Sequence, residues 1–372
     1  CRNSISSNRR HGGDGHAWHI ASDTERFCSN ERQTRCVYVD ADGCTRSMSQ
    51  HSPLDKAFVQ LGVTTRNGHD ESMHYGAVVG LARDGSIEFA LGDPSTIVYP
   101  RSSTKPIQAT AMVASGLDLP PRLLALVCAS HDGSPMHLAA AREILLSAGL
   151  TEDDLGNTKD YPLNDDAAAE VLRGGGVKTK LQMNCSGKHS GMLATCVHNG
   201  WSHDETYLHE SHPLQQRITQ MVPELSGEDA AFIGIDGCGA PAHAMSLTAL
   251  ARVFRTVVMS DPTSAPGKVA HAMRSHPEMV GGPRRDVTLL MQGVPGLLGK
   301  DGAEGVFAIA MPDGRAVALK IADGANRARP PMMKVALEAL GIDTSGVDPQ
   351  AFDTTIYGHG IPVGSVRITA TL

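Results

Sequence analysis

The chain has 372 residues, of which 41% are hydrophobic and 20% charged, and its formal net charge is −7. This length suffices for one large domain or for two lobes that share a site. The mild acidity argues against a nucleic-acid partner, because phosphate binding needs a basic surface. No apolar run approaches the roughly 20 residues of a membrane helix, and no secretory signal is recognisable. We therefore expect a cytoplasmic protein without a membrane or nucleic-acid partner.

The first part of the chain differs in composition from the rest. Residues 1–50 contain no leucine and few other large apolar side chains, so they bury too little surface to offset the entropy of ordering. The sequence also does not begin with methionine. We expect residues 1–72 to be a disordered or non-native extension, with Met48 or Met73 as candidate starts, and residues 73–372 to form the folded domain.

The cysteines divide between these two parts. Four lie in the extension at spacings typical of no known site, and four lie in the predicted domain: Cys128, Cys185, Cys196 and Cys238. Without a secretory signal, buried thiols or a metal site are expected in the domain rather than disulfides.

Alternating or apolar runs predict strands near both ends of the domain. These runs are residues 77–82, 86–91, 306–311, 315–321 and 365–372. Asp84-Gly85 joins the first two runs and Pro312-Asp313-Gly314 the next two, and both are turn sequences typical of hairpins. Because the chain between them is mostly helical, we expect an α+β fold. Residues 75–100 and 303–372 would share one antiparallel sheet, flanked by helices and a helical lobe.

Helices are predicted from their start signals and apolar periodicity. The segments are residues 107–115, 123–130, 135–148, 165–172, 241–259 and 331–340. Ser134 is suited to cap the third of these, since Pro135 fits the first helical position. Pro241 is likewise interpreted as the first residue of the helix that runs to about Met259.

Ser102 and Lys105 are the first candidate functional pair. If Ser102 caps the helix that follows, Lys105 lies one turn later on the same face. A serine hydroxyl needs a base to become a good nucleophile, and a lysine serves as that base when burial or neighbours lower its pKa. Because S-x-x-K also recurs by chance, a capped surface helix remains the alternative for this segment on its own.

Two later segments resemble the further motifs of S-x-x-K enzymes, which add a second-loop serine and a K-T-G strand. Ser130 lies in a polar turn after an apolar helix, and Ser134 competes for the same role. Lys300-Asp301-Gly302 precedes the C-terminal strands, where K-T-G is expected, although an aspartate replaces the threonine.

Cys185 and Cys238 lie in the densest clusters of functional groups. Each precedes a predicted helix, whose N-terminus favours a thiolate. Two such thiolates can bind Zn²⁺, and chemistry alone suggests His189 as the third ligand. Two small buried residues in glycine-rich turns are the alternative interpretation.

Five segments together resemble the rhizobial-type L-asparaginases of the asparaginase II family. They are Tyr-Pro-Arg-Ser-Ser-x-Lys-Pro, Cys-Ala-Ser-His, Met-Asn-Cys-Ser-Gly-Lys-His, Gly-Ile-Asp-Gly-Cys-Gly-Ala-Pro and Gly-Ala-Glu-Gly-Val. The resemblance covers about residues 73–372. It implies hydrolysis of L-asparagine to L-aspartate and ammonia, a homodimer, and a fold similar to serine β-lactamases, penicillin-binding proteins and glutaminases.

The resemblance also implies roles for individual residues. It pairs Ser102 with Lys105 and Ser130 with Lys300 in two catalytic dyads, without deciding which serine attacks. It assigns zinc to Cys185, Lys188 and Cys238, so that the lysine replaces His189 as a ligand.

The substrate contacts and the role of the metal are further expectations. Asp236 is a candidate for the ammonium group of the substrate and Arg101 for its carboxylate, and His189 is expected near the substrate. We expect zinc to orient the substrate loops rather than to activate water, because the dyads already provide a nucleophile. The alternatives are a β-lactamase or D,D-peptidase activity and a zinc-binding relative without catalysis.

Overall fold

The computed structural model describes residues 37–39, 45–47 and 54–372. It divides the chain into two units, residues 1–51 and Ser52–Leu372. The first contains one antiparallel pair, β1 (Val37–Val39) with β2 (Thr45–Ser47). The other residues before 54, including Met48, lie outside the described residues. All further elements belong to the second unit.

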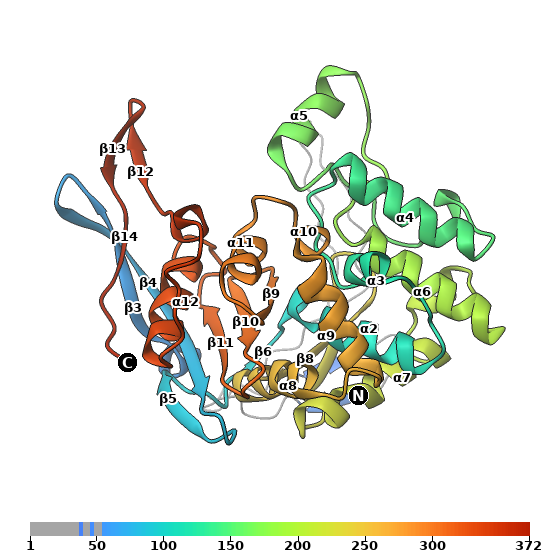
Figure 1. Cartoon of the computed structure of the whole chain (residues 1–372), viewed down its shortest axis with the longest axis horizontal. Helices are drawn as coiled ribbons and strands as arrows, with labels where there is room; N and C mark the ends of the chain where they lie inside the picture. The colour runs from blue at the N-terminus through green and yellow to red at the C-terminus, as the bar shows by residue number, and fades with distance from the viewer. Residues whose placement is uncertain (1–36, 40–44, 48–53) are drawn as a thin grey trace, which may run out of the picture. The chain divides into compact units, whose positions relative to one another are not determined.

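A seven-stranded antiparallel sheet joins the two ends of the second unit, and the order along it is β14-β3-β4-β11-β10-β9, with β5 also paired to β4 (Figure 1). Its strands are β3 (Val59–Arg66), β4 (His69–Leu81), β5 (Ile87–Leu91), β9 (Leu298–Gly302), β10 (Val306–Ala310), β11 (Ala316–Ile321) and β14 (Val366–Ile368). The predicted α+β architecture and both hairpins are confirmed. The last strand is shorter than predicted.

The predicted boundary between extension and domain is wrong, because residue 73 lies inside β4 and β3 precedes it. Strand β3 pairs with β4 from Val59↔Gly76 to Arg66↔His69. The turn is Asn67-Gly68, with φ values of 48° and 84°. An Asn-Gly pair with both residues at positive φ is the preferred two-residue hairpin turn. This signal, between two β-rich runs, was already present in the sequence and extends the folded unit to residues before 73.

A second correction concerns residues 241–259. The predicted helix is a strand followed by a helix: β8 (Pro241–Ser246) pairs with β6 (Ile97–Val98) and β7 (Phe232–Ile235), and α8 (Leu247–Met259) follows. The side chain of Ser246 accepts a 2.9 Å hydrogen bond from the backbone N–H of Ala249. A serine cap, and not Pro241, therefore marks the start of the helix.

The remaining elements follow the predictions closely where these were made. The helices are α1 (Leu54–Ala57), α2 (Lys105–Ala114), α3 (Pro121–Val127), α4 (Pro135–Ser147), α5 (Asp165–Arg173), α6 (Ser186–Asn199), α7 (Pro213–Ser226), α9 (Ala265–Ser275), α10 (Pro277–Val280), α11 (Asp286–Gly293) and α12 (Arg329–Ala339). Short 3₁₀ helices are η1 (Arg101–Thr104), η2 (Glu152–Asp154), η3 (Glu205–Leu208) and η4 (Pro349–Phe352), and β12 (Ile356–Gly358) pairs with β13 (Ile361–Gly364). No helix in the described part of the chain is long and apolar enough to span a membrane.

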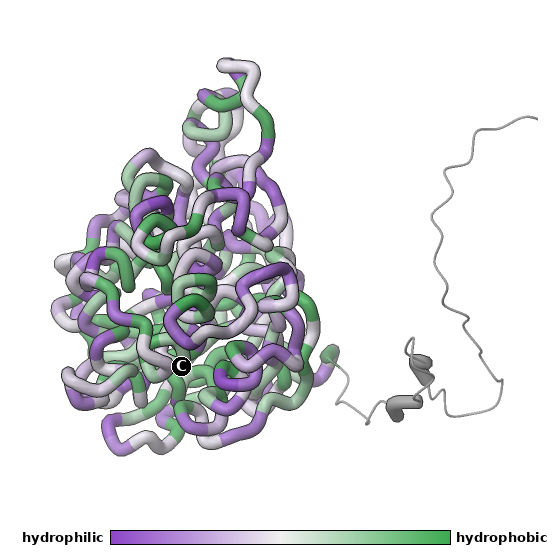
Figure 2. Tube along the Cα trace, turned by 90° about the vertical axis from the view of Figure 1, so that its right-hand side faces the viewer, coloured by the Kyte–Doolittle hydropathy of each residue, from purple (hydrophilic) through white to green (hydrophobic). Residues whose placement is uncertain are grey.

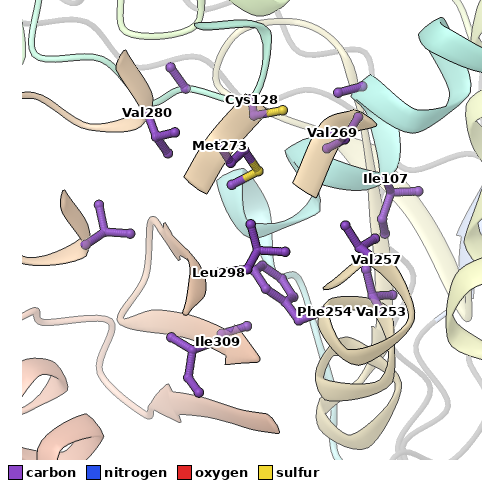
Figure 3. Packing of buried hydrophobic residues seen from close by; sticks show 14 of the residues in the cluster. Ile107, Cys128, Val253, Phe254, Val257, Val269, Met273, Val280, Leu298 and Ile309 are labelled. Atoms are coloured by element: carbon purple, nitrogen blue, oxygen red, sulfur yellow. The ribbon is translucent and has the colours of Figure 1, made fainter. Parts of the chain in front are cut away.

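Helices pack against the sheet and against one another around one continuous apolar core. Helix α8 packs on β4, β10 and β11, and α12 packs on β10, β11 and β14. Figure 3 shows Phe254 of α8 directed towards Leu298 of β9, with Met273 of α9 between Leu298 and Cys128. Polar and apolar stretches alternate along the trace of this unit (Figure 2), as expected when each element turns one side inwards.

Leu61 tests whether β3 belongs to the core. Its side chain is 0% exposed in β3, whereas Val59 in the same strand is 37% exposed. We expect Leu61→Ala to lower the free energy of unfolding by about 2–5 kcal/mol, and Val59→Ala by less than about 1 kcal/mol. Denaturant titration measures both. If Leu61→Ala lowered the free energy of unfolding no more than is expected for Val59→Ala, β3 would lie outside the cooperative unit.

Candidate active site

Ser102 lies in a strained turn that follows β6. Arg101 has φ 54°, a left-handed conformation that is uncommon for a residue other than glycine and that often marks functional sites. Ser102 is the second residue of η1, so it does not cap α2; Thr104 stands at that position. The early 3₁₀ turn explains this difference, because the backbone N–H of Lys105 donates to the carbonyl oxygen of Ser102. The Ser102 side chain is half-buried and makes no hydrogen bond within the described part of the chain.

Lys105 lies one turn after Ser102 and is 2% exposed. Its Nζ donates to the Ala129 carbonyl oxygen and, over 3.1 Å, to the Ser130 hydroxyl. Lys105 therefore follows one candidate serine along the chain and contacts the other directly. The structure joins Ser130 to Lys105, and not to Lys300, by a hydrogen bond.

Ser130 is held in a buried loop after α3. Its backbone N–H donates to the Val280 carbonyl oxygen over 3.0 Å. The next residue, His131, bonds the carbonyl oxygen of Asn184 through its backbone N–H and the hydroxyl of Ser186 through its ring, over 2.9 Å. The Ser130 loop is thereby attached to the loop that carries Cys185.

Ser134, the competing serine, has a different role. It stands at the N-cap position of α4, as predicted, but its hydroxyl bonds the ring of His137 over 2.8 Å instead of a backbone N–H. Ser134 therefore bonds a histidine, whereas Ser130 bonds the buried Lys105.

Strand β9 brings Lys300 to the same region. The Ser103 hydroxyl in η1 donates to the Lys300 carbonyl oxygen over 3.0 Å. A Cβ atom on Gly302 would lie 2.3 Å from the Pro100 carbonyl oxygen, so only glycine permits this approach of η1 to β9. The glycine of the Lys-Asp-Gly motif therefore has a packing role.

Lys300 is 0% exposed, and its Nζ donates to both the backbone oxygen and Oδ1 of Asp301 over 2.6 Å each. Burial lowers the pKa of Lys300 to about 8, with Lys105 adding to the effect and Asp301 opposing it. Such an amine exchanges protons near neutral pH.

The candidate metal ligands converge from two loops. Cys185 is the N-cap residue of α6, as predicted, whereas Cys238 lies in the turn between β7 and β8 and precedes no helix. Gly239, with φ 89°, forms part of this turn. The Lys188 ammonium lies 3.1 Å from the Cys238 sulfur. All three candidate ligands are buried.

The electrostatics of this set suit a thiolate at Cys238. A hydrogen bond from Cys185, together with the positive charge of Lys188, holds the pKa of the Cys238 thiol well below its usual value. Burial disfavours the Lys188 ammonium, but Cys238, Cys185 and Asp236 together outweigh this effect and raise the pKa of Lys188. Thiolates and a deprotonated amine are Zn²⁺ donors. The set therefore fits a metal ion that displaces the protons of Lys188 and Cys185.

His189 lies beside the candidate ligands, on the next residue of α6. Its Nδ1 is 2.6 Å from the Tyr207 hydroxyl, and its buried Nε2 makes no well-formed hydrogen bond within the described residues. Within these residues, no group of three His, Cys, Asp and Glu side chains is arranged to hold a metal ion. A metal ion held at Cys185 and Cys238 would therefore need a ligand of another type, and Lys188 is the amine that lies beside them.

Arg101 and Asp236 bind each other, through Nη2 and Oδ1 at 2.7 Å. Glu304, also at positive φ (61°), has its carboxylate 3.9 Å from Arg101. A cavity of about 510 Å³ opens beside Arg101 and Glu304, with Tyr99 and Lys320 among its lining residues. The two residues predicted to hold the charged ends of a substrate thus form one charged cluster at the edge of a cavity.

The partners of Asp301 are two arginines that no sequence motif marks. Arg285 and Arg329 both pair with its carboxylate, and Arg329 also pairs with Asp286. The departure from K-T-G at Asp301 was the available signal, because a buried aspartate requires a cationic partner.

A serine beside a buried lysine, with a second buried amine nearby, is an arrangement typical of serine hydrolases that use lysine as the base. The chain belongs to the L-asparaginase II family, whose model matches residues 63–368. This match begins within β3, in agreement with the corrected boundary. A search of the curated proteins found no match.

Solved structures of hydrolases show a distant likeness. A β-lactamase from Mycobacterium bovis is 17% identical, with a TM-score of 0.37 over 71% of this chain and 94% of its own. A putative β-lactamase from Bacteroides dorei is 15% identical, with a TM-score of 0.38 over 71% and 93%. EstCE1, a hydrolase with promiscuous acyltransferase activity, is 12% identical, with a TM-score of 0.34 over 77% and 95%.

Gly302 tests the contact between η1 and β9. We expect Gly302→Ala to lower stability by about 1–3 kcal/mol, because its Cβ collides with a backbone oxygen. Gly299→Ala in the same strand is the control, since its nearest neighbours are side-chain atoms at 3.3 Å. Thermal unfolding compares the two variants. A Gly302→Ala protein as stable as Gly299→Ala would contradict the close contact.

Proposed function

We propose that this protein hydrolyses L-asparagine to L-aspartate and ammonia by serine-lysine catalysis. The observation that carries the proposal is the buried Lys105, which contacts Ser130 and follows Ser102 by one turn. Membership of the L-asparaginase II family supports the amide substrate.

Accessibility favours Ser102 as the attacking residue. Its hydroxyl is half-buried and has no hydrogen-bond partner in the described part of the chain, whereas Ser130 is 5% exposed and already bonded to Lys105. In the proposed first step, the Ser102 oxygen attacks the side-chain carbonyl carbon of asparagine and Lys105 accepts its proton. The carbon–nitrogen bond then breaks and leaves an acyl-enzyme.

The leaving group needs a proton at this step. Ser130 is bonded to Lys105 and can pass that proton on, and Lys300 is an amine whose pKa lies at about 8. Proton donation by a positioned acid contributes typically about 10²–10⁴-fold. Water then hydrolyses the acyl-enzyme and releases aspartate.

Arg101 and Asp236 support recognition of a zwitterionic substrate. Arg101, which lines the cavity, is suited to the carboxylate of asparagine, and Asp236, which pairs with Arg101, is suited to its ammonium. His189 lies beside the candidate metal ligands, where it can help to orient the same loops.

We propose Zn²⁺ as a bound metal, held by Cys185, Lys188 and Cys238. When bound, zinc would supply a fixed positive charge that orients the two loops. The backbone bond from His131 to Asn184 and the ring bond to Ser186 connect one of these loops to Ser130. The chain therefore offers a direct route by which an ordered metal loop holds Ser130 beside Lys105.

A homodimer and a cytoplasmic location complete the proposal. The cysteines of the described residues, Cys128, Cys185, Cys196 and Cys238, are free and buried, which is compatible with a reducing compartment. Light scattering of the purified protein tests the dimer.

Catalysis is tested by ammonia release from L-asparagine. We expect the purified protein to release ammonia, and Ser102→Ala to lose at least about 10³-fold in kcat. Ser115→Ala, at the C-cap position of α2 and half-buried like Ser102, is the matched control and should retain full activity. Acid quenching during turnover followed by peptide mass spectrometry should locate the acyl group on Ser102. An acyl group on Ser130 would reverse the assignment, and no ammonia release would refute the function.

Metal content is tested separately by elemental analysis. We expect about one zinc per chain, lost in Cys238→Ser because one of the ligands is removed. Cys196→Ser is the control. Cys196 is also buried in α6, but burial alone raises the pKa of its thiol, and none of the proposed ligands contributes. Zinc retained by Cys238→Ser would count against this site.

A further inference from the structure

Lys300 and Asp301 occupy the edge strand of the large sheet. Strand β9 pairs only with β10 in the described part of the chain, with Lys300 opposite Ala308 and Asp301 opposite Phe307. Successive residues of a strand point to opposite faces. The Arg329 guanidinium lies over the Phe307 ring at 5.2 Å, so α12 covers the face that Asp301 occupies. Lys300 begins on the other face of the sheet.

The Lys300 side chain nevertheless reaches back to Asp301. Its Nζ donates to Oδ1 and to the backbone oxygen of Asp301. The other carboxylate oxygen, Oδ2, pairs with Arg285 and lies 3.6 Å from Arg329. One buried carboxylate is therefore shared by three cations. Arg329 is itself held by Asp286 at 2.6 Å.

We propose that Asp301 is a positioning residue that fixes the Lys300 ammonium on the strand that contacts η1, where Ser102 lies, and that Arg285 sets the strength of this hold by competing for the same carboxylate. This proposal rests on the function proposed above and gives the aspartate in the Lys-Asp-Gly motif a role. A threonine in its place would offer no negative charge.

The charges around Lys300 determine the direction of each effect. Lys105 faces it from α2 and disfavours its charged form, as does Arg285 from the segment before α11. Cys128, at the end of α3, is also within electrostatic reach, and burial raises the pKa of that thiol to about 12, so it is neutral. Asp301 is then the anion that keeps Lys300 protonated. Although burial opposes it, Lys300, Arg285 and Arg329 hold the pKa of Asp301 well below its usual value.

Removal of the Asp301 carboxylate and removal of the Arg285 guanidinium should therefore shift the pKa of Lys300 in opposite directions. Without the carboxylate, Asp301→Asn lowers the pKa of Lys300. Without the competing guanidinium, Arg285→Gln leaves Asp301 more available to Lys300 and raises its pKa. A charge a few ångströms away in a protein shifts a pKa by about one unit or more. If Asp301 and Arg285 had only a structural role, both variants would be less stable, but the pKa of Lys300 would not shift in opposite directions.

The experiment follows the ionisation of Lys300 in two ways. NMR titration of the full chain with ¹³C-labelled lysine, with Lys300→Arg used to assign the signal, measures the pKa without any substrate. The pH profile of kcat for L-asparagine measures it in turnover, where the limb at high pH reports loss of the proton that Lys300 donates. Arg315→Gln is the control, since Arg315 pairs with Asp313 in the turn between β10 and β11.

We expect the Lys300 midpoint to fall by about one pH unit in Asp301→Asn, to rise in Arg285→Gln and to stay unchanged in Arg315→Gln. Unchanged or parallel midpoints in the first two variants would overturn the proposal. If Asp301→Asn fails to fold, the sign of the shift in Arg285→Gln decides alone. An opposite pair of NMR shifts in a protein that releases no ammonia would support the positioning of Lys300 and refute only the function.

Discussion

Three lysine side chains are buried in the interior of the second unit, and the rest of the site is arranged around their charges. Lys105, Lys188 and Lys300 are 2%, 1% and 0% exposed. Transfer of an ammonium group out of water is costly unless a partner compensates for it. Each lysine has a different partner: a serine hydroxyl and a carbonyl oxygen, a cysteine sulfur, and an aspartate. All three residues are lysines, so the different partners are what gives their amines different chemical properties.

The partners also connect the segments that carry them. Lys105 ties α2 to the loop of Ser130, and His131 ties that loop to the start of α6. Lys188 ties α6 to the turn of Cys238, which begins beside Asp236 and so reaches Arg101. These contacts form a chain of hydrogen bonds and ion pairs through the site. Displacement of any one loop therefore leaves a buried charge elsewhere without its partner or exposes it to water. For this reason the polar residues of the site must be ordered together.

The sequence predicted the elements whose signals are local. The hairpin turns at Asp84-Gly85 and Pro312-Asp313-Gly314 and the proline-led helix at Pro135 were found because a few neighbouring residues determine them. The motif segments around Ser102, Ser130, Cys185, Cys238 and Lys300 were also found, and the structure brings Lys105 to Ser130 and Lys188 to Cys238. The helix predicted from Pro241 failed because pairing with β7 outweighs local propensity there.

Contacts between distant residues could not be predicted in the same way. Arg285, Arg329 and Asp286 surround Asp301, but arginine and aspartate are common on protein surfaces and no spacing distinguishes these three. The hydrogen bond of Lys105 likewise depends on how α3 ends, and not on the S-x-x-K spacing. Only the tertiary structure shows which of several nearby hydroxyls a lysine reaches.

The bond between Ser103 and the Lys300 backbone joins residues 197 positions apart. Ser102 stands next to the first of these residues, and Gly302 makes the approach possible. A ribosome-bound chain that has emerged only as far as α9 therefore has every cysteine and both serines of the site but not the strand against which η1 rests. Long-range contacts of this kind form late. The nascent protein would thus remain without a complete candidate site until the residues around Lys300 have left the ribosome.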